Sequence, residues 1–212
     1  MKAHIFVDNS NLWLGASDIR QEREAHVPQR LFRLYFKNLF KLVERDLEVV
    51  TRELGGSLPP ECEPLWEYAR ELGYNTNLLH RVHDGDRVRE QSVDEALHLK
   101  IANCIIDFDA PGRFVLMTGD GAQSELNTSF RDQARRALKS GFEVDVWSWA
   151  ASRSRKYELL KQDFPDKIRI HDLDNYYNEI TFVNQGTWTH SDGTSVDIAG
   201  RVVCQLSSSI GV

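Results

Sequence analysis

The stretch HIFVDNSN, residues 4–11, decides the fold class, because an apolar run meets a carboxylate with no polar residue in between. A continuous apolar run such as Ile5-Phe6-Val7 is typical of a strand that is covered on both faces, as in a parallel sheet. Asp8 follows the run at once. Ligands of open parallel sheets bind outside the carboxyl ends of the strands, so Asp8 is the first candidate for a functional residue.

Short β-branched or aromatic runs alternate with longer helical patterns along most of the chain, which favours an α/β fold with a mostly parallel sheet. We predict strands at residues 4–7, 47–54, 75–82, 113–118, 142–147 and 168–172, and helices at 28–43, 62–72, 92–108, 124–139 and 155–162. The polar residues 81–91 lie between the third predicted strand and the helix at 92–108, and they are predicted to form a loop. Right-handed crossovers then place helices on both faces of the sheet.

After residue 177 an alternating pattern replaces the helical period. We therefore predict a domain at residues 1–177 and a small antiparallel β-hairpin extension at residues 178–212. Because an open strand edge can pair with a second copy, a homodimer is one expected partnership.

Composition narrows the class of protein. No apolar stretch approaches the ~18 residues of a membrane span, and three widely spaced cysteines fit a reducing compartment, so we expect a cytoplasmic protein with no membrane partner. No G-x-G-x-x-G or P-loop glycine pattern follows a strand. The formal net charge of −6 is unusual for a protein that binds nucleic acid through its overall field.

Three carboxylates are predicted to meet at one edge of the sheet. Asp8 and Asp120 each follow a strand, and Asp94 lies in the first turn of a helix that follows another. Each has a structural explanation taken singly, as a turn residue, a helix cap or a first-turn acid. Together they would repel one another unless a cation neutralised them, and oxygen ligands select Mg²⁺ or Mn²⁺.

These motifs resemble a known family. Residues 5–11, IFVDNSN, resemble the "hydrophobic-hydrophobic-D-x-S/G-N" opening of NYN domains, which belong to the PIN-like nuclease superfamily. Residues 92–97, SVDEAL, resemble the "K-x-V-D-x-x-L" segment of that family, and residues 116–121, LMTGDG, its "S-G-D-x-D-F" strand end. The resemblance covers residues 3–176, with the motifs in the family's order.

The resemblance implies a PIN-like (Rossmannoid) α/β sheet. It also implies a metal-dependent ribonuclease whose substrate is single-stranded RNA. It implies that Asp8, Asp94 and Asp120 are catalytic metal ligands for Mg²⁺ or Mn²⁺, and that Asn11 supports Asp8. Such a site would hydrolyse RNA phosphodiester bonds by activating water and stabilising phosphoryl charge.

Two positions depart from the family pattern: Ala122 replaces the second acid of the "GDxD" segment, and Gln91 replaces the usual lysine. Glu125, one turn further on, is the expected substitute acid, although a first-turn glutamate also stabilises a helix by itself. The alternative is a catalytically degenerate PIN-like protein that binds RNA or protein.

Further side chains are predicted near the substrate. Arg81 and Arg87 can hold RNA phosphates from the polar loop, or lie in solvent. The ammonium of Lys100 can reach the acidic edge or lie along the core, and Ser124 opens the helix beyond Asp120. Trp147 and Trp149 can stack bases, but core packing is the favoured interpretation.

Overall fold

The computed structural model describes residues 1–57, 63–79, 82–84, 87–89, 92–119, 128–189 and 191–207. Its centre is a sheet of six strands in the order β4-β3-β1-β7-β8-β9, and every neighbouring pair is parallel. The strands are β1 Lys2–Asp8, β3 Glu48–Ser57, β4 Asn75–Leu79, β7 Arg113–Met117, β8 Glu143–Ser148 and β9 Ile168–Asp172. The predicted α/β class with a parallel sheet is therefore confirmed.

The strand order places a reversal of direction between β1 and β7. From β1 the chain first builds outward through β3 to β4, then returns to the other side of β1 and builds outward through β7, β8 and β9. This is the doubly wound order, in which ligands bind at the carboxyl ends of the strands where the direction reverses. The ends of β1 and β7 are therefore the place to look for a site.

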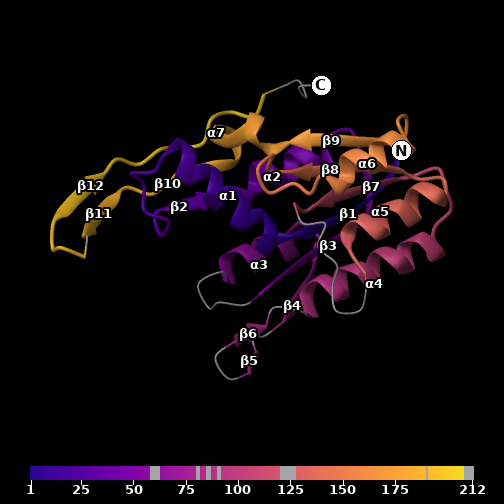
Figure 1. Ribbon diagram of the computed structural model, residues 1–212, viewed down its shortest axis with the longest axis horizontal. Coiled ribbons are helices and arrows are strands. Elements are labelled where there is room, and N and C mark those ends of the chain that lie inside the picture. The colour runs from indigo at the N-terminus through magenta and orange to yellow at the C-terminus, as the bar shows by residue number, and fades with distance from the viewer. Residues whose placement is uncertain are drawn as a thin grey trace.

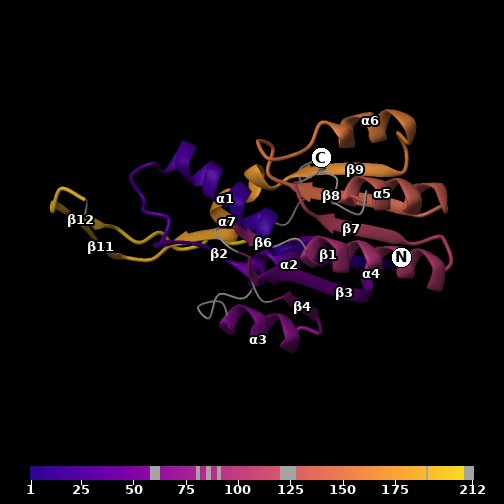
Figure 2. The same cartoon turned by 60° about the horizontal axis from the view of Figure 1, so that its bottom comes forward.

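Helices cover the sheet on both faces, as Figures 1 and 2 show. Those packed with Ile5 and Val7 are α1 Asn9–Arg23, α2 Phe36–Glu44 and α3 Glu63–Glu71. Those packed with Phe6 are α4 Ser92–Asp107, α5 Phe130–Lys139 and α6 Lys156–Asp163. Alternate side chains of β1 thus enter two cores, which explains why its apolar run is continuous.

The predicted helix at residues 28–43 was wrong in its first half. Phe32–Leu34 forms a short strand, β2, which pairs antiparallel with β10, Thr181–Val183. Phe32 and Leu34 are buried and Arg33 is exposed, so this segment follows a strand period. Its partner lies about 150 residues further along the chain, and α2 begins only after it.

No element was predicted for residues 9–27, where the structure has the fifteen-residue helix α1. Two of the positions that α1 buries are Gly15 and Ala16, beside Leu12 and Ile19, so its apolar stripe is inconspicuous in the sequence. A Cβ on Gly15 would lie 2.5 Å from Trp149, which explains why so small a residue is needed there.

Two other boundaries differ from the prediction. Within the expected loop, the described residues Val82–Asp84 and Arg87–Arg89 pair as the antiparallel strands β5 and β6. The helix expected from residue 124 was wrong at its start: α5 begins at Phe130, because Ser129 has an extended backbone and caps the helix, and residues 120–127 lie outside the described ranges.

The C-terminal part contains the small antiparallel sheet that the alternation predicted. After η2 Leu173–Tyr176 and α7 Tyr177–Ile180, strand β10 joins β2, and β11 Gly186–Thr189 pairs with β12 Ser195–Ile198. Figure 1 shows the β11–β12 hairpin projecting away from the parallel sheet. Ile180, Val183 and Ile198 are nevertheless buried in the core that contains Ile5.

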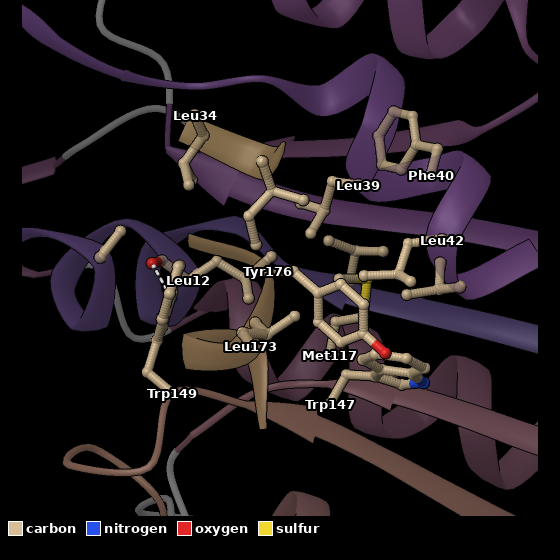
Figure 3. Packing of buried hydrophobic residues seen from close by; sticks show 14 of the residues in the cluster. Leu12, Leu34, Leu39, Phe40, Leu42, Met117, Trp147, Trp149, Leu173 and Tyr176 are labelled. Atoms are coloured by element: carbon tan, nitrogen blue, oxygen red, sulfur yellow. Dashed lines mark hydrogen bonds between the residues drawn. The ribbon is translucent and has the colours of Figure 1, made fainter. Parts of the chain in front are cut away.

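Trp147 and Trp149 belong to the core, as favoured. Trp147 is 3% exposed and lies near Met117 and Tyr176 (Figure 3). Trp149 is buried and its Nε1 donates a hydrogen bond of 2.9 Å to the carbonyl of Leu12 in α1. In the described ranges, no helix has the length and apolar character needed to cross a membrane.

Candidate functional site

Asp8 lies at the carboxyl end of β1 and is completely buried. It caps α1: its Oδ1 accepts a hydrogen bond of 3.1 Å from the backbone N–H of Asn11. The side-chain amide of Asn11 donates to the other oxygen, Oδ2, and so does the hydroxyl of Thr118 at 3.4 Å. The expected support of Asp8 by Asn11 is thus present, and the carboxylate has a fixed orientation.

Thr118 connects the ends of the two central strands. It follows β7, is completely buried, and donates its backbone N–H to the carbonyl of Trp147 at 3.2 Å. Its hydroxyl reaches Asp8 across the β1–β7 boundary, which is the point where the strand order reverses. The buried Asp8 carboxylate therefore occupies the position where sheets of this type bind ligands.

The segment after β8 packs against this same edge. A Cβ on Gly119 would lie 2.6 Å from the hydroxyl and 3.0 Å from the carbonyl oxygen of Ser152, so a larger residue would displace the Ser152 side chain and press on its backbone. The backbone N–H of Ser154 donates to the carbonyl of Gly119 at 2.9 Å. The chain leaving β7 is consequently held against the loop between β8 and α6.

The direction of α4 brings Asp94 to this edge as well. The thiol of Cys104 lies 3.7 Å from the hydroxyl of Thr51, and the ammonium of Lys100 lies 3.5 Å from Glu53, so α4 runs antiparallel to β3. Asp94 precedes Lys100 by six residues, which moves it about 9 Å further toward the carboxyl edge. Asp8 and Asp94 are thus at the same edge of the sheet, and Asp94 is partly buried there.

The other predicted site residues lie wholly or partly outside the described part of the chain. Asp120, Glu125, Ser124 and Arg81 lie outside the described residues, and for Arg87 only the backbone in β6 is described. In the described part of the chain, no group of three or more His, Cys, Asp or Glu residues is close enough to hold a metal ion. The two acids that are described offer only carboxylate oxygens, which suit a hard cation such as Mg²⁺ or Mn²⁺ in chemical type.

Lys100 pairs with an acid of β3 that was not among the predicted site residues. Its ammonium pairs with the nearly buried carboxylate of Glu53, which also accepts a hydrogen bond of 3.0 Å from the side chain of Asn75. Glu53 is opposite Phe6 in the β1–β3 register, two residue pairs before the pair of Asp8 and Gly55, and so on the same face of the sheet. The sequence analysis did not select this buried acid. The feature that could have indicated it is a charged residue, Glu53, inside a predicted strand between Thr51 and Leu54.

His98 was also missed. It follows Asp94 by four residues on α4, so the two side chains lie on one face of the helix. Its imidazole is 3% exposed and meets the ring of Phe130 edge-on at 4.6 Å. Burial lowers the pKa of His98 to about 4, although Asp132 acts in the opposite direction, so the ring is neutral at pH 7.

The fold and this edge define an α/β protein with a doubly wound parallel sheet and a buried carboxylate at its reversal point. Comparison with protein-family models gives no match, and comparison with curated proteins gives none either. The resemblance to NYN domains therefore rests on the sequence motifs, and membership of that family stays a prediction.

Proposed function

We propose that this protein is a divalent-metal-dependent endoribonuclease that hydrolyses RNA phosphodiester bonds in the cytoplasm. The observation that carries the proposal is the fully buried Asp8 at the β1–β7 reversal point, held by Asn11 and Thr118, with Asp94 on the same edge. A completely buried carboxylate at a ligand-binding edge costs desolvation energy that a bound cation would offset.

In this proposal the acids share the metal-binding role. Asp8 and Asp94, with Asp120 and Glu125, would hold Mg²⁺ or Mn²⁺, while Asn11 and Thr118 orient the Asp8 carboxylate as outer-shell partners usually do. A divalent cation, when bound, supplies a Lewis acid for water activation and for the charge on the phosphoryl oxygens. Single-stranded RNA is the proposed substrate.

A second candidate function is a PIN-like binding protein without catalysis. Two observations favour it: Ala122 replaces a family acid, and the Asp8 carboxylate already caps α1 and accepts bonds from Asn11 and Thr118. A carboxylate with these partners has a structural role even when no cation is present.

Cleavage assays with Mn²⁺ on varied single-stranded RNAs distinguish the two. We expect metal-dependent cleavage by the wild-type chain, and at least about a hundredfold slower cleavage after Asp8→Asn or Asp94→Asn, because several kcal/mol of charge stabilisation is lost. Asparagine caps a helix as well as aspartate does, so Asp8→Asn keeps α1 intact. Asp18→Asn, an exposed position of α1, is the matched control and should leave the rate unchanged.

Thermal unfolding gives an independent measurement. A cation bound only by the folded state at about 100 times its Kd stabilises by about 2.7 kcal/mol, or about 5–10 °C for a chain of this size. We expect Mn²⁺ to raise the melting temperature of the wild type and of Asp18→Asn, but not that of Asp8→Asn. Absence of both cleavage and stabilisation in folded wild-type protein contradicts the nuclease and supports the binding protein.

A further inference from the structure

The outer face of α4, on the side away from the sheet, carries two large apolar side chains in solvent. Leu99 is 63% exposed and Ile106 is 80% exposed. They are seven residues apart, so they lie two turns apart on one face of the helix. The opposite face buries Leu97, Ile101 and Cys104 in the core. In Figure 1, α4 runs along the lower edge of the molecule beside α5, so a partner can reach its outer face.

Beside these two residues lies a second pair with the same spacing and opposite charges. Lys100 follows Leu99 and Asp107 follows Ile106, so both charges lie on the same flank of the outer face. The side chain of Lys100 is 46% exposed although its ammonium contacts Glu53 at 3.5 Å, and Asp107 is exposed. An ammonium has three donors, so Lys100 can keep its contact with Glu53 and bind a further carboxylate. The outer face thus has an apolar residue beside a cation at one end and an apolar residue beside an anion at the other.

This face is complementary to a second copy of itself in one orientation. In a two-fold symmetric dimer, the same pair of residues makes each contact twice. When two α4 helices lie antiparallel and cross at residues 102–103, Leu99 of one copy is level with Ile106 of the other. Lys100 is then within two residues, about 3 Å along the helix, of the level of Asp107 in the other copy. Apolar side chains therefore meet apolar ones, and each cation meets an anion.

The parallel orientation lacks this match. A parallel pair would place Lys100 opposite Lys100 and Asp107 opposite Asp107 of the other copy, and like charges that face each other across an interface oppose association. The residues at the antiparallel crossing are also short, Ala102 and Asn103. Short side chains at the contact let two helix axes approach closely, which allows the longer side chains on either side of the crossing to pack.

We propose that the chain forms a symmetric homodimer in which the outer face of α4 pairs antiparallel with α4 of a second copy. The inference goes beyond the proposed function and does not depend on it. One pair of sixteen-residue helices gives an interface at or below the ~1,200 Å² that marks weak complexes, so we expect a dissociation constant on the order of 10–100 µM. Because Asp94 is in the first turn of α4, the two Asp94 backbones would be about 25 Å apart along the helices, at opposite ends of the interface.

The test measures the oligomeric state of the full chain without RNA or metal. Sedimentation velocity at concentrations from about 1 to about 500 µM should show a reversible equilibrium between monomer and dimer. We expect Leu99→Glu and Ile106→Glu each to raise the dissociation constant at least about tenfold, because a charge then enters the apolar contact twice per dimer. Asp107→Lys faces Lys100 of the other copy and should raise it about fivefold, with a smaller effect at high salt.

Leu159→Glu is the matched control. Leu159 is 56% exposed on α6, so the same change of side chain is made outside the proposed interface. We expect its dissociation constant to stay within about twofold of the wild-type value. Melting temperatures of the variants within a few degrees of the wild type, measured at low concentration, show that they are folded. A wild-type chain that stays monomeric at about 500 µM, or a dimer that Ile106→Glu leaves intact, overturns the proposal.

Cysteine cross-linking tests the orientation of the two helices. In a chain with Cys62→Ser and Cys204→Ser, the remaining natural thiol, Cys104, is buried. Antiparallel pairing predicts that Leu99→Cys and Ile106→Cys chains of this background form a disulfide-linked dimer when they are mixed under mild oxidation, because the two positions are level with each other. Each chain alone should give little cross-linked product. A cross-link that forms equally well in Leu99→Cys alone, or none in the mixture, overturns the antiparallel pairing.

Discussion

At the scale of single residues, Glu24 joins the end of α1 to the C-terminal part of the chain. Its carboxylate forms two hydrogen bonds of 2.9 Å with the guanidinium of Arg201 and accepts one of 2.6 Å from the hydroxyl of Tyr177. Burial acts to raise the pKa of Glu24, but the bonds from Arg201 and Tyr177 outweigh it and the pKa is lowered. A lowered carboxyl pKa means that the charged form stabilises the fold.

We therefore predict that Glu24→Gln lowers the free energy of unfolding by about 2 kcal/mol at pH 7, or the melting temperature by about 4–8 °C. Because the pKa is lowered on folding, this contribution is present above the ordinary pKa of 4.5 and is lost as the pH falls through the lowered value. The difference between wild type and variant, measured by thermal unfolding, should therefore shrink below about pH 4.

Glu22→Gln provides the control for that prediction. Glu22 is exposed on the same helix and undergoes the same change of charge, so its effect should stay within about 0.5 kcal/mol. A loss in Glu24→Gln no larger than this would show that the bonds to Arg201 contribute little.

At the scale of elements, the strands and helices that could be predicted are those whose own residues show an apolar or capping pattern. The strand at Ile5-Phe6-Val7 enters two cores, and the helix beginning at Ser92 has a capping pattern and a clear apolar stripe. The strand β2 was not predictable locally, because Phe32–Leu34 forms a strand only by pairing with β10. Distant pairing leaves no mark in a short window of sequence.

The residues of the candidate site likewise fall into those that the local sequence predicts and those that it does not. Asp8 and Asn11 were predictable because a strand end and a helix cap are local features, and the structure shows both. Glu53 and His98 were not, since their importance comes from burial at the edge rather than from their neighbours in the chain. The pairing of Lys100 with Glu53 likewise depends on the position of α4 across β3.

One face of β7, β8 and β9 carries a ladder of cross-strand pairs that tests the packing of the sheet. The register places Arg113 opposite Glu143 and Asp145 opposite Arg169, and both arginines also reach across to the other acid. Burial acts to raise the pKa of Asp145, but the nearby imidazole of His171, at 3.9 Å, and the charges of the two arginines outweigh it and the pKa is lowered.

We predict that Asp145→Asn destabilises the protein by about 2 kcal/mol, whereas Glu143→Gln costs less than about 1 kcal/mol. The side chain of Asp145 is 9% exposed and that of Glu143 is 33% exposed, so solvent screens the second far more. Urea unfolding at constant m-value measures both. Equal losses would mean that burial does not decide the strength of these pairs.

At the scale of the whole molecule, the β11–β12 hairpin is attached through a narrow base. Val183 and Arg201 exchange two backbone hydrogen bonds of 2.9 Å, so the chain entering the hairpin and the chain leaving it lie side by side. Beyond that base, Arg30 donates to the carbonyl of Thr187 at 2.7 Å and covers the ring of Trp188 at 4.5 Å. The tip extends away from the parallel sheet (Figure 1).

We predict that the body folds without the tip of the hairpin. Replacing residues 188–196 with Asn-Gly closes the Thr187–Asp197 pair with a two-residue turn and keeps the buried Ile198. The main losses are the contact of Arg30 with Trp188, about 0.5–1 kcal/mol, and the packing of the partly buried Trp188 on the core, about 1–2 kcal/mol, so the total should stay below about 3 kcal/mol. Trp188→Ala in the full chain measures the contributions of that ring together. A loss above about 3 kcal/mol would show that the tip stabilises the body, and conversion of a dimer to a monomer in light scattering would assign the predicted homodimer to this hairpin.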